Sequence, residues 1–433
     1  MLSINNSKLS NDGGVTNADN NDLFGMAFLY DQTDSNLIDT AKYDGKLNAV
    51  KWMARDGIGY ERSYIYSYDQ LNRYKAEMYA ERTAASTGAF SNNVHGFDEN
   101  NITYDYGGNI LTLSRNSSVE GTNSNTAIDN LSYAYSTTNP DQLYTVTDAT
   151  HNAAGFNPGT GSGNYVYDPN GNLTNDPYKN LAISYNYLNR TSSITVASTQ
   201  NINYTYDASG TLIRKQEYSG GTLQTTTDYI DGFNYVNGTL SYFPMPEGRV
   251  VNNAGTLTQQ FVITDQQGNA RISFQNNGSN TAVVTQENSY YGFGLILPNS
   301  PVNPSSPANK QLYNGGSEWQ NDYSNLPDYY QTFNRNYDAA LGRWIAVDPE
   351  AESTESMSTY QYAGNNPVMF NDPQGNTKLA PQDDPMSYSV PRSRPGYMWA
   401  IDGGGDDGYA YQDMVAPSRE YPRREKRGGL LVL

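Results

Sequence analysis

The sequence predicts an all-β protein built from repeated hairpins, and three observations lead to this prediction. Tyr dominates the aromatic residues, with 38 Tyr against 12 Phe and 4 Trp. Tyr suits a half-buried sheet face because its ring is apolar while its hydroxyl needs a hydrogen-bond partner. The 39 Gly, together with many Asn and Asp, indicate many tight turns. Finally, a short alternating pattern returns along much of the chain.

The composition excludes several classes of function. The net charge of -18 argues against a nucleic-acid partner, because phosphate contacts need clustered Lys and Arg. The basic run REYPRREKR (419–427) is more typical of a solvated terminus than of a nucleic-acid site. The chain has no Cys, which excludes disulfides, thiolate metal sites and Cys nucleophiles.

The amino-terminal residues 1–22 are rich in Asn, Asp, Ser and Gly, and we expect a flexible lead-in there. They lack the basic and apolar regions of a signal peptide. The sequence has no run of about 18 apolar residues, so no transmembrane segment is predicted. Either the protein is cytosolic when made, or this chain is the carboxy-terminal part of a longer one.

The returning pattern is an aromatic alternation that ends in Tyr-Asp, followed by turn residues and an alternating exit strand. Its copies are YIYSYDQLNRYKAEM from Tyr64, ITYDYGGNILTLSR from Ile102, LSYAYSTTNPDQLYTVTD from Leu131, YVYDPNGNLT from Tyr165, ISYNYLNRTSSITV from Ile183, INYTYDASGTLIRK from Ile202 and FVITDQQGNARISF from Phe261. Tyr-x-Tyr places both rings on one face of a strand, and Asp followed by Gly or Asn favours a hairpin turn. Each copy is therefore one hairpin, and stacked copies would bury that face for one another.

The repeats resemble the YD repeats of the Rhs and teneurin-like superfamily. Residues 334–375 carry NYDAALGRWIAVDP, then YQYAGNNPVMFNDPQG, and resemble the Rhs repeat-associated core domain. The resemblance implies a strip of YD-repeat hairpins over 23–310, which spirals into a partial β-shell, and a core domain over 311–375 that closes it. A variable and mostly irregular carboxy-terminal tail, 376–433, would follow.

In related shells the core domain is an aspartate-dependent autoprotease that cuts shortly after the final Asp-Pro-x-Gly. The resemblance assigns catalytic roles to Asp348 and Asp372, with Arg343 as the basic partner. Two carboxylates in a poorly solvated site can divide the roles of acid and base, and an Arg can stabilise the oxyanion. This chain has Asn376 where the family has a bulky aliphatic residue. In the alternative interpretation, both Asp residues simply open turns before Pro.

Other polar groups give weaker indications. His95 and His151 lie far apart in polar contexts and are interpreted as surface residues, so no His-based catalytic or metal site is predicted. The segments DENN (98–101), DPNGN (168–172) and DQQGN (265–269) are interpreted as turns, since none has the ligand spacing of a calcium loop. No metal and no cofactor is predicted.

Together with the order of repeats, core and tail, the resemblance implies the structural shell or carrier part of an exported bacterial Rhs protein, presenting or enclosing a polymorphic-toxin-like tail. We expect it at the cell surface or secreted, bound to a protein partner such as an upstream chain, the secretion machinery, or an immunity or cargo protein. One alternative is a cell-surface adhesin that binds carbohydrate or protein through exposed Tyr. Another is the autoprotease, and a toxin activity in the tail is the most remote.

Overall fold

The computed structural model describes residues 2–9, 22–55, 59–156, 162–279, 281–298, 307–376 and 378. All of these residues belong to the first of the two units, Met1–Ala400 and Ile401–Leu433, into which the chain divides. Apart from Asn376 and Lys378, the predicted tail lies outside the described residues. No helix in the described part is long and apolar enough to cross a membrane.

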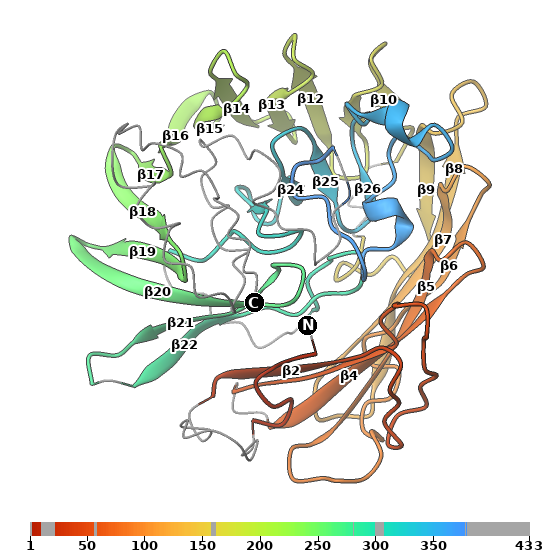
Figure 1. Cartoon of the computed structure of the whole chain (residues 1–433). Coiled ribbons are helices and arrows are strands. Elements are labelled where there is room, and N and C mark those ends of the chain that lie inside the picture. Colours follow the sequence, from red (N-terminus) through yellow and green to blue (C-terminus); the bar gives the residue numbers. More distant parts are fainter. Residues whose placement is uncertain are drawn as a thin grey trace, which may run out of the picture. The chain divides into compact units, whose positions relative to one another are not determined.

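The first sheet holds nine strands of the described chain, each hydrogen-bonded to the next in sequence order and antiparallel to it (Figure 1). They are β1 (Ser3–Ile4), β2 (Phe24–Leu29), β3 (Ala49–Ala54), β4 (Tyr60–Tyr68), β5 (Tyr74–Thr83), β6 (Glu99–Tyr104), β7 (Ile110–Ser118), β8 (Asn125–Tyr135) and β9 (Leu143–Asp148). Neighbours in sequence are thus neighbours in space, which short turn segments favour.

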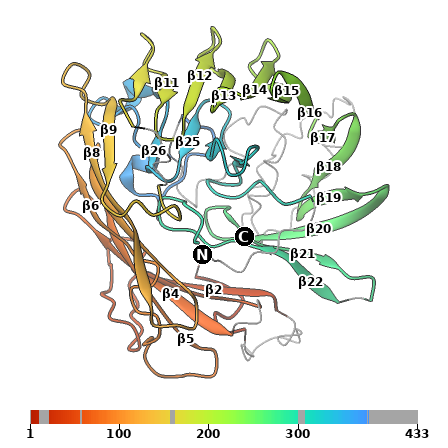
Figure 2. The same ribbon diagram turned by 180° about the vertical axis from the view of Figure 1, so that it is seen from behind.

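The second sheet continues the same meander with thirteen described strands. They are β10 (Val166–Tyr167), β11 (Leu173–Asp176), β12 (Leu181–Tyr185), β13 (Thr191–Val196), β14 (Gln200–Tyr206), β15 (Leu212–Ser219), β16 (Thr222–Ile230), β17 (Phe233–Val236), β18 (Thr239–Met245), β19 (Gly248–Asn253), β20 (Thr256–Thr264), β21 (Ala270–Asn276) and β22 (Ala282–Glu287). The amide of Tyr165 donates to the oxygen of Tyr144 over 2.9 Å, which connects the two sheets. Together they form one curved strip (Figure 2).

The two ends of the strip meet through side chains. The guanidinium of Arg271 in β21 lies 5.4 Å from the ring centre of Phe24 in β2 and 5.3 Å from that of Trp52 in β3. Cation–π contacts of this kind stabilise a protein modestly when they are buried. The strip therefore curls until β21, near one end, contacts β2 and β3, near the other.

The concave side of the strip surrounds a small third sheet. Its described strands are β23 (Glu318–Gln320), β24 (Tyr329–Gln331), β25 (Asn336–Asp338) and β26 (Arg343–Trp344), all antiparallel. Two 3-10 turns follow, η2 (Ala351–Thr354) and η3 (Ala363–Asn365). These elements lie inside the curve in Figures 1 and 2. We call residues 311–376 the core segment.

Every copy of the returning sequence pattern falls on a hairpin. An Asp side chain bonds across the turn in five of the seven copies, and Ser136 and Asn186 take its place in the other two. In the copy from Ile102, Asp105 accepts hydrogen bonds from the amide of Asn109 at 2.8 Å and from its side chain at 2.9 Å. Gly108 has a φ of 85°, which favours glycine. The Asp168–Asn172 pair repeats both bonds at 2.9 and 3.0 Å. The turn interpretation is confirmed for 168–172 and 265–269, where the Gly amide closes the turn onto Asp168 and Asp265. It was wrong for 98–101, because residues 99–101 lie in strand β6.

In five of the copies, the Tyr that ends the first strand ties its hairpin to the preceding one, because its hydroxyl donates to a backbone oxygen there. The pairs, with oxygen–oxygen distances of 2.5–2.8 Å, are Tyr68 to Leu47, Tyr104 to Tyr74, Tyr135 to Ile110, Tyr185 to Leu173 and Tyr206 to Thr191. Phe could fill the same volume but could not make this bond. The bonds explain why the strip uses Tyr.

The structure differs from the sequence-based expectation at the amino terminus. Residues 1–22 are expected to be flexible, yet β1 pairs with β2, with Ser3 opposite Ala27. The hydroxyl of Ser7 also donates to the buried carboxylate of Glu61 over 2.7 Å. These polar residues are held because they satisfy groups on the strip that would otherwise be unpaired. Residues 10–21 lie outside the described part.

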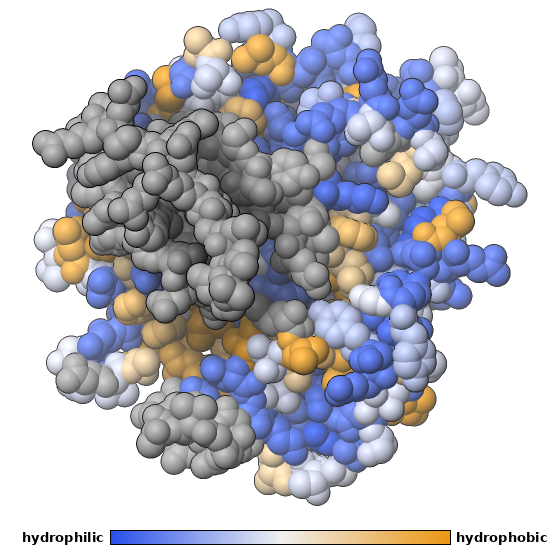
Figure 3. Space-filling view, viewed as in Figure 1, coloured by the Kyte–Doolittle hydropathy of each residue, from blue (hydrophilic) through white to orange (hydrophobic). Residues whose placement is uncertain are grey.

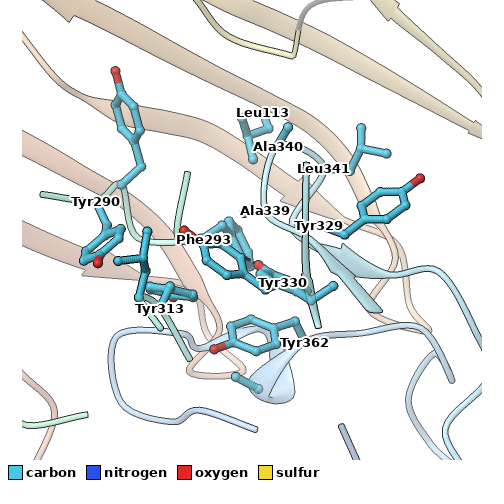
Figure 4. Close-up of a cluster of buried hydrophobic side chains, with 14 of the residues drawn as sticks. Leu113, Tyr290, Phe293, Tyr313, Tyr329, Tyr330, Ala339, Ala340, Leu341 and Tyr362 are labelled. Carbon is cyan, nitrogen blue, oxygen red and sulfur yellow. Dashed lines mark hydrogen bonds between the residues drawn. The ribbon is translucent and has the colours of Figure 1, made fainter. Parts of the chain in front are cut away.

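The larger of the two buried apolar clusters in the described part of the chain joins the strip to the core segment (Figure 4). At its centre, the rings of Tyr337 and Tyr362 lie 4.1 Å apart between centroids, and Trp344 packs edge-on against both. Offset and edge-on aromatic contacts stabilise beyond the area they bury. The inner face of the strip is therefore covered by the protein's own core segment.

Candidate functional site

The core segment is attached to the turns of the repeats. At six turns along the strip, a side chain or backbone group of the core segment forms a hydrogen bond with a group of the turn. These pairs are Asn366 with Asn72, Asn365 with Gly108, Arg343 with Asp141, Tyr360 with Gly171, Phe333 with Arg190, and Pro367 with Gln267. A segment of about forty residues thus contacts hairpins from both ends of the strip. The Asn-Asn-Pro turn in the sequence, 365–367, supplies three of these contacts.

Asp348 and Asp372 come together around one buried Arg. The Nη2 of Arg335 donates to Oδ2 of Asp348 over 3.0 Å and to Oδ2 of Asp372 over 3.3 Å. All three residues are buried. The predicted pairing of the two carboxylates is thus present in the structure.

The basic partner is Arg335, and the expected Arg343 lies elsewhere. Arg343 donates to the backbone oxygen of Asp141 over 2.7 Å and packs against the rings of Tyr135 and Tyr360. It makes no ion pair with either Asp within the described residues. The difference arises because β26 directs Arg343 toward the strip turns, while β25 begins beside Arg335.

Arg335 could not be identified from sequence reasoning because it stands alone in NRNYD, without a periodic or charged pattern around it. One signal was available: a cation immediately before a predicted buried strand needs a partner. Its guanidinium is 4.4 Å from the ring centre of Trp344, and Nη1 donates to Thr359 over 3.1 Å. These contacts fix the orientation of the Arg335 side chain.

Burial controls the protonation of the two carboxyl groups. It raises the pKa of Asp372 above its usual value, and the nearby charge of Asp348 raises it further, while Arg335 opposes both effects. Burial likewise raises the pKa of Asp348 against the opposing effect of Arg335. Of two carboxyl groups beside one cation, one can be protonated while the other is ionised. General acid–base catalysis needs one group in each of these states.

Asn314 fixes the backbone of Asp372 from the other side. Its Oδ1 accepts the Asp372 amide over 2.7 Å, and its Nδ2 donates to the Asp372 oxygen over 2.7 Å. The hydroxyl of Tyr362 also donates to Asn314 Oδ1, over 2.9 Å. Asn314 is fully buried. Such support limits the movement of the Asp372 carboxyl group.

The chain directly after Asp372 is held by the same site. Arg335 Nε donates to the oxygen of Gly375 over 2.8 Å, and the amide of Asn334 donates to Gln374 over 3.0 Å. Gly375 has a φ of 71°, and a Cβ there would come within 2.3 Å of the Thr332 hydroxyl. The next amide, of Asn376, donates to Asp372 over 2.9 Å. The residues before the predicted cut are thus bound close to both carboxyls.

The two His residues are not part of this site. His95 Nδ1 lies 2.6 Å from Oδ2 of Asp98, with about half of the His95 side chain exposed. The amide of His151 donates to Asp148 over 3.0 Å as part of a turn. Within the described ranges, no group of three or more His, Asp or Glu has the arrangement to hold a metal ion.

Two small cavities lie where the core segment meets the strip. One is lined by Arg190, Phe333 and Arg335 among others, and the other by Asn109, Arg343 and Gln361 among others. Each has a volume of about 10 Å³, which fits roughly one water molecule. Neither could hold an organic ligand.

Comparisons with known proteins show the fold. No protein-family model and no curated protein sequence matches the chain. Among solved structures, a Tc holotoxin pore from Photorhabdus luminescens with a mutated TccC3 has a TM-score of 0.54 and 14% identity, covering 86% of this chain and 19% of that chain. The TcdB2–TccC3–Cdc42 structure has a TM-score of 0.50 and 14% identity, covering 82% and 18%. The chain has an Rhs/YD-repeat-like fold.

This likeness confirms the predicted fold class, which is all-β with antiparallel hairpins forming a curved strip around the core segment. The chain spans about a fifth of the length of the solved chains that it resembles. At 14% identity, the likeness concerns the fold. The first of those structures is described as a holotoxin pore, and the second pairs TcdB2 with TccC3.

Proposed function

We propose that this chain is the structural shell or carrier part of an exported bacterial Rhs protein, and that it presents or encloses the variable segment 376–433. The observation that carries the proposal is the attachment of one core segment to turns at both ends of the strip. Such an attachment holds a long strip in a fixed curve. The Tc toxin complexes provide a structural precedent for a carrier.

The distribution of Tyr favours a carrier over an adhesin. Of the Tyr residues that the structure describes, seventeen are buried, while four (Tyr43, Tyr106, Tyr144 and Tyr187) are largely exposed. An adhesin that stacks sugars needs rows of exposed rings. The exposed Tyr residues stand singly on separate turns or strands, so they provide no such row.

Limited proteolysis tests the carrier proposal. We expect a resistant fragment that retains residues 22–376 and loses the tail. A double variant, Asn365→Ala with Asn366→Ala, removes two bonds to the strip turns and should shorten the lifetime of that fragment. Asn253→Ala, at the exposed end of β19, is the matched control and should not shorten that lifetime. The absence of any resistant fragment in the wild-type protein would refute the proposal.

We further propose that β22 is the docking edge for a strand of another protein chain. Within the described part, β22 pairs only with β21, and its Val283 is 43% exposed. The rings of Phe261 and Phe274 stack beside it at 5.3 Å and are half-buried. Figure 3 shows hydrophobic residues gathered at the lower left of this face, where β20–β22 run in Figure 1. An apolar sheet edge invites strand addition.

Val283→Lys tests the docking edge, because a charge on an edge strand opposes strand pairing. We expect wild-type protein to associate as its concentration rises, measured by light scattering at physiological salt, and Val283→Lys to remain monomeric. Ile213→Lys on the interior strand β15, where Ile213 is 39% exposed, should behave as wild type. A wild-type protein that stays monomeric at every concentration would count against the proposed edge.

Autoproteolysis after the core segment is the second candidate function, and the binding of Gly375 beside Asp348 and Asp372 favours it. Asp372 would act as base and Asp348 as acid, with Arg335 in the role that the sequence suggested for Arg343. Intact mass spectrometry tests this function. A species that ends shortly after Gly375 should appear in the wild-type protein and be absent in Asp372→Asn. The control variant Asp168→Asn should still produce it. A single full-length species in the wild-type protein would leave the core segment as a structural plug.

A further inference from the structure

The tip of one hairpin lies at the centre of the protein. Residues Tyr291–Gly294, between β22 and the core segment, form a tight turn closed by the bond from the Gly294 amide to the Tyr291 oxygen, 2.7 Å. Phe293 packs among the aromatic side chains of the core (Figure 4). The tip lies between β5 and β6 of the strip on one side and the third sheet on the other.

Groups from both sides bind the backbone of this tip. Three hydroxyls of the core segment donate to its oxygens: Tyr313 to Gly292 at 2.7 Å, Tyr337 to Phe293 at 2.7 Å and Tyr330 to Gly294 at 3.3 Å. From the strip, Glu77 accepts the Gly292 amide at 2.9 Å and Glu99 accepts the Phe293 amide at 3.0 Å. The tip therefore fastens the core segment to the first sheet.

The two carboxylates that hold the tip lie directly opposite each other. Glu77 in β5 pairs with Glu99 in β6, and the two side chains are 1% and 0% exposed. Arg115 makes ion pairs with Glu99 at 2.7 Å and with Asp129 at 2.9 Å. Among the described residues, no Lys, Arg or His lies within ion-pair distance of Glu77. Like charges directly opposite on neighbouring strands destabilise a sheet.

The surroundings of Glu77 favour its neutral form. Burial raises the pKa of Glu77 well above its usual value, and the charge of Glu99 raises it further. The interactions with Gly292 and Tyr74 oppose these two larger effects, and the charge of Asp98 adds a smaller rise. The titratable and charged groups that face it are Glu99, Asp98, Arg115, Tyr64, Tyr66, Tyr74 and Tyr291. Arg115, the only cation among these, is already paired with two carboxylates.

We propose that Glu77 is a proton-dependent latch, which holds the Tyr291–Gly294 tip while it is protonated and releases it when it ionises. Loss of the proton would place two negative charges side by side in a dry site with one shared cation. The tip would leave and water would enter between the core segment and β5 and β6. The latch would act whether or not the tail is a cargo.

The sign of the pH dependence follows from linkage. A carboxyl whose pKa is higher in the folded state favours the closed state fully below its unfolded pKa, about 4.3. That contribution is lost as the pH rises through the folded pKa. The latch is therefore closed in acid and opens toward alkaline pH. Each pH unit within the window shifts the equilibrium by up to about tenfold.

Glu77→Gln tests the latch, because Gln keeps an oxygen for the Gly292 amide and cannot ionise. Hydrogen exchange of the peptide containing residues 288–297 is followed from pH 5 to pH 9, corrected for the intrinsic rise of exchange with pH. We expect wild-type protection of this peptide to fall as the pH rises, and that of Glu77→Gln to stay level. Glu247→Gln, at an exposed turn, is the matched control and should follow the wild type.

Two results would overturn the latch. One is a wild-type protein in which the protection of the tip against hydrogen exchange stays constant from pH 5 to pH 9, while the β13–β14 hairpin also stays protected. The other is a pH profile of Glu77→Gln that coincides with that of the wild type. If Glu77→Gln fails to fold, the wild-type profile alone still decides, since the latch requires the tip to lose protection before the β13–β14 hairpin.

Discussion

The guanidinium of Arg115 in β7 donates a 2.9 Å hydrogen bond to the backbone oxygen of Ala340, 225 residues further along the chain. A second nitrogen reaches the oxygen of Ala339 at 3.1 Å. The same side chain neutralises Glu99 and Asp129. One buried cation thus joins three strands of the strip to the core segment.

Arg115→Met should destabilise the protein strongly. The substitution leaves two buried carboxylates without their cation, which costs about 3–5 kcal/mol. Urea unfolding followed by Trp fluorescence measures the loss. Arg214→Met, which removes an exposed guanidinium paired with Asp228, is the control and should change the midpoint little. Equal effects of the two substitutions would show that Arg115 does not join the strip to the core segment.

Arg335→Gln should make stability depend more steeply on pH. Without the guanidinium, the already raised pKa values of Asp348 and Asp372 rise further. Folded-state pKa values above the unfolded ones mean that stability is lost as the pH rises. The free energy of unfolding should therefore fall from pH 5 to pH 8 more in Arg335→Gln than in the wild type. Arg343→Gln removes a buried cation that has no carboxylate partner among the residues the structure describes, so it should keep the wild-type slope.

Tyr185→Phe measures the value of one hairpin-to-hairpin bond. The hydroxyl of Tyr185 donates to Leu173 over 2.7 Å, so its removal leaves a buried oxygen with one bond fewer and should cost about 1 kcal/mol. Thermal unfolding detects a change of this size. Tyr187→Phe, two residues away on an 87% exposed side chain, should be neutral. A neutral Tyr185→Phe would mean that the strip does not need these hydroxyls.

Gly294→Ala should loosen the tip of the central hairpin. Gly294 has a φ of 92°, and a Cβ there would come within 2.4 Å of the Tyr313 ring. Backbone strain and overpacking together should cost about 2–4 kcal/mol. Gly220→Ala, at a φ of 57° with open space around it, carries the backbone cost alone. The difference between the two melting temperatures isolates the clash with Tyr313.

The hairpins were predictable from sequence because their determinants are local. Tyr-x-Tyr alternation and an Asp with Gly or Asn after it specify a strand and its turn within about ten residues. The curl of the strip depends on contacts between distant residues, such as Arg271 with Phe24, which no local pattern reveals. The ordered conformation of the amino-terminal residues likewise depends on a distant contact, the hydrogen bond from Ser7 to Glu61.

The candidate site was predictable in part. The two Asp-Pro steps identified Asp348 and Asp372, and the structure brings these side chains together at Arg335. The choice of Arg343 over Arg335 was wrong because sequence proximity to the motif does not determine which way a side chain points. Asn314 carries no sequence signal, since its role is to bond to a backbone 58 residues away.

The attachment of the core segment to the repeat turns has a consequence for biosynthesis. Asn72 emerges from the ribosome 294 residues before Asn366, the residue that binds it. During translation, the inner apolar face of the growing strip therefore has nothing to cover it, and uncovered strands of this kind aggregate. We therefore expect chains truncated before Arg335 to be insoluble, and a nascent chain to depend on chaperones until Asn366 has been made.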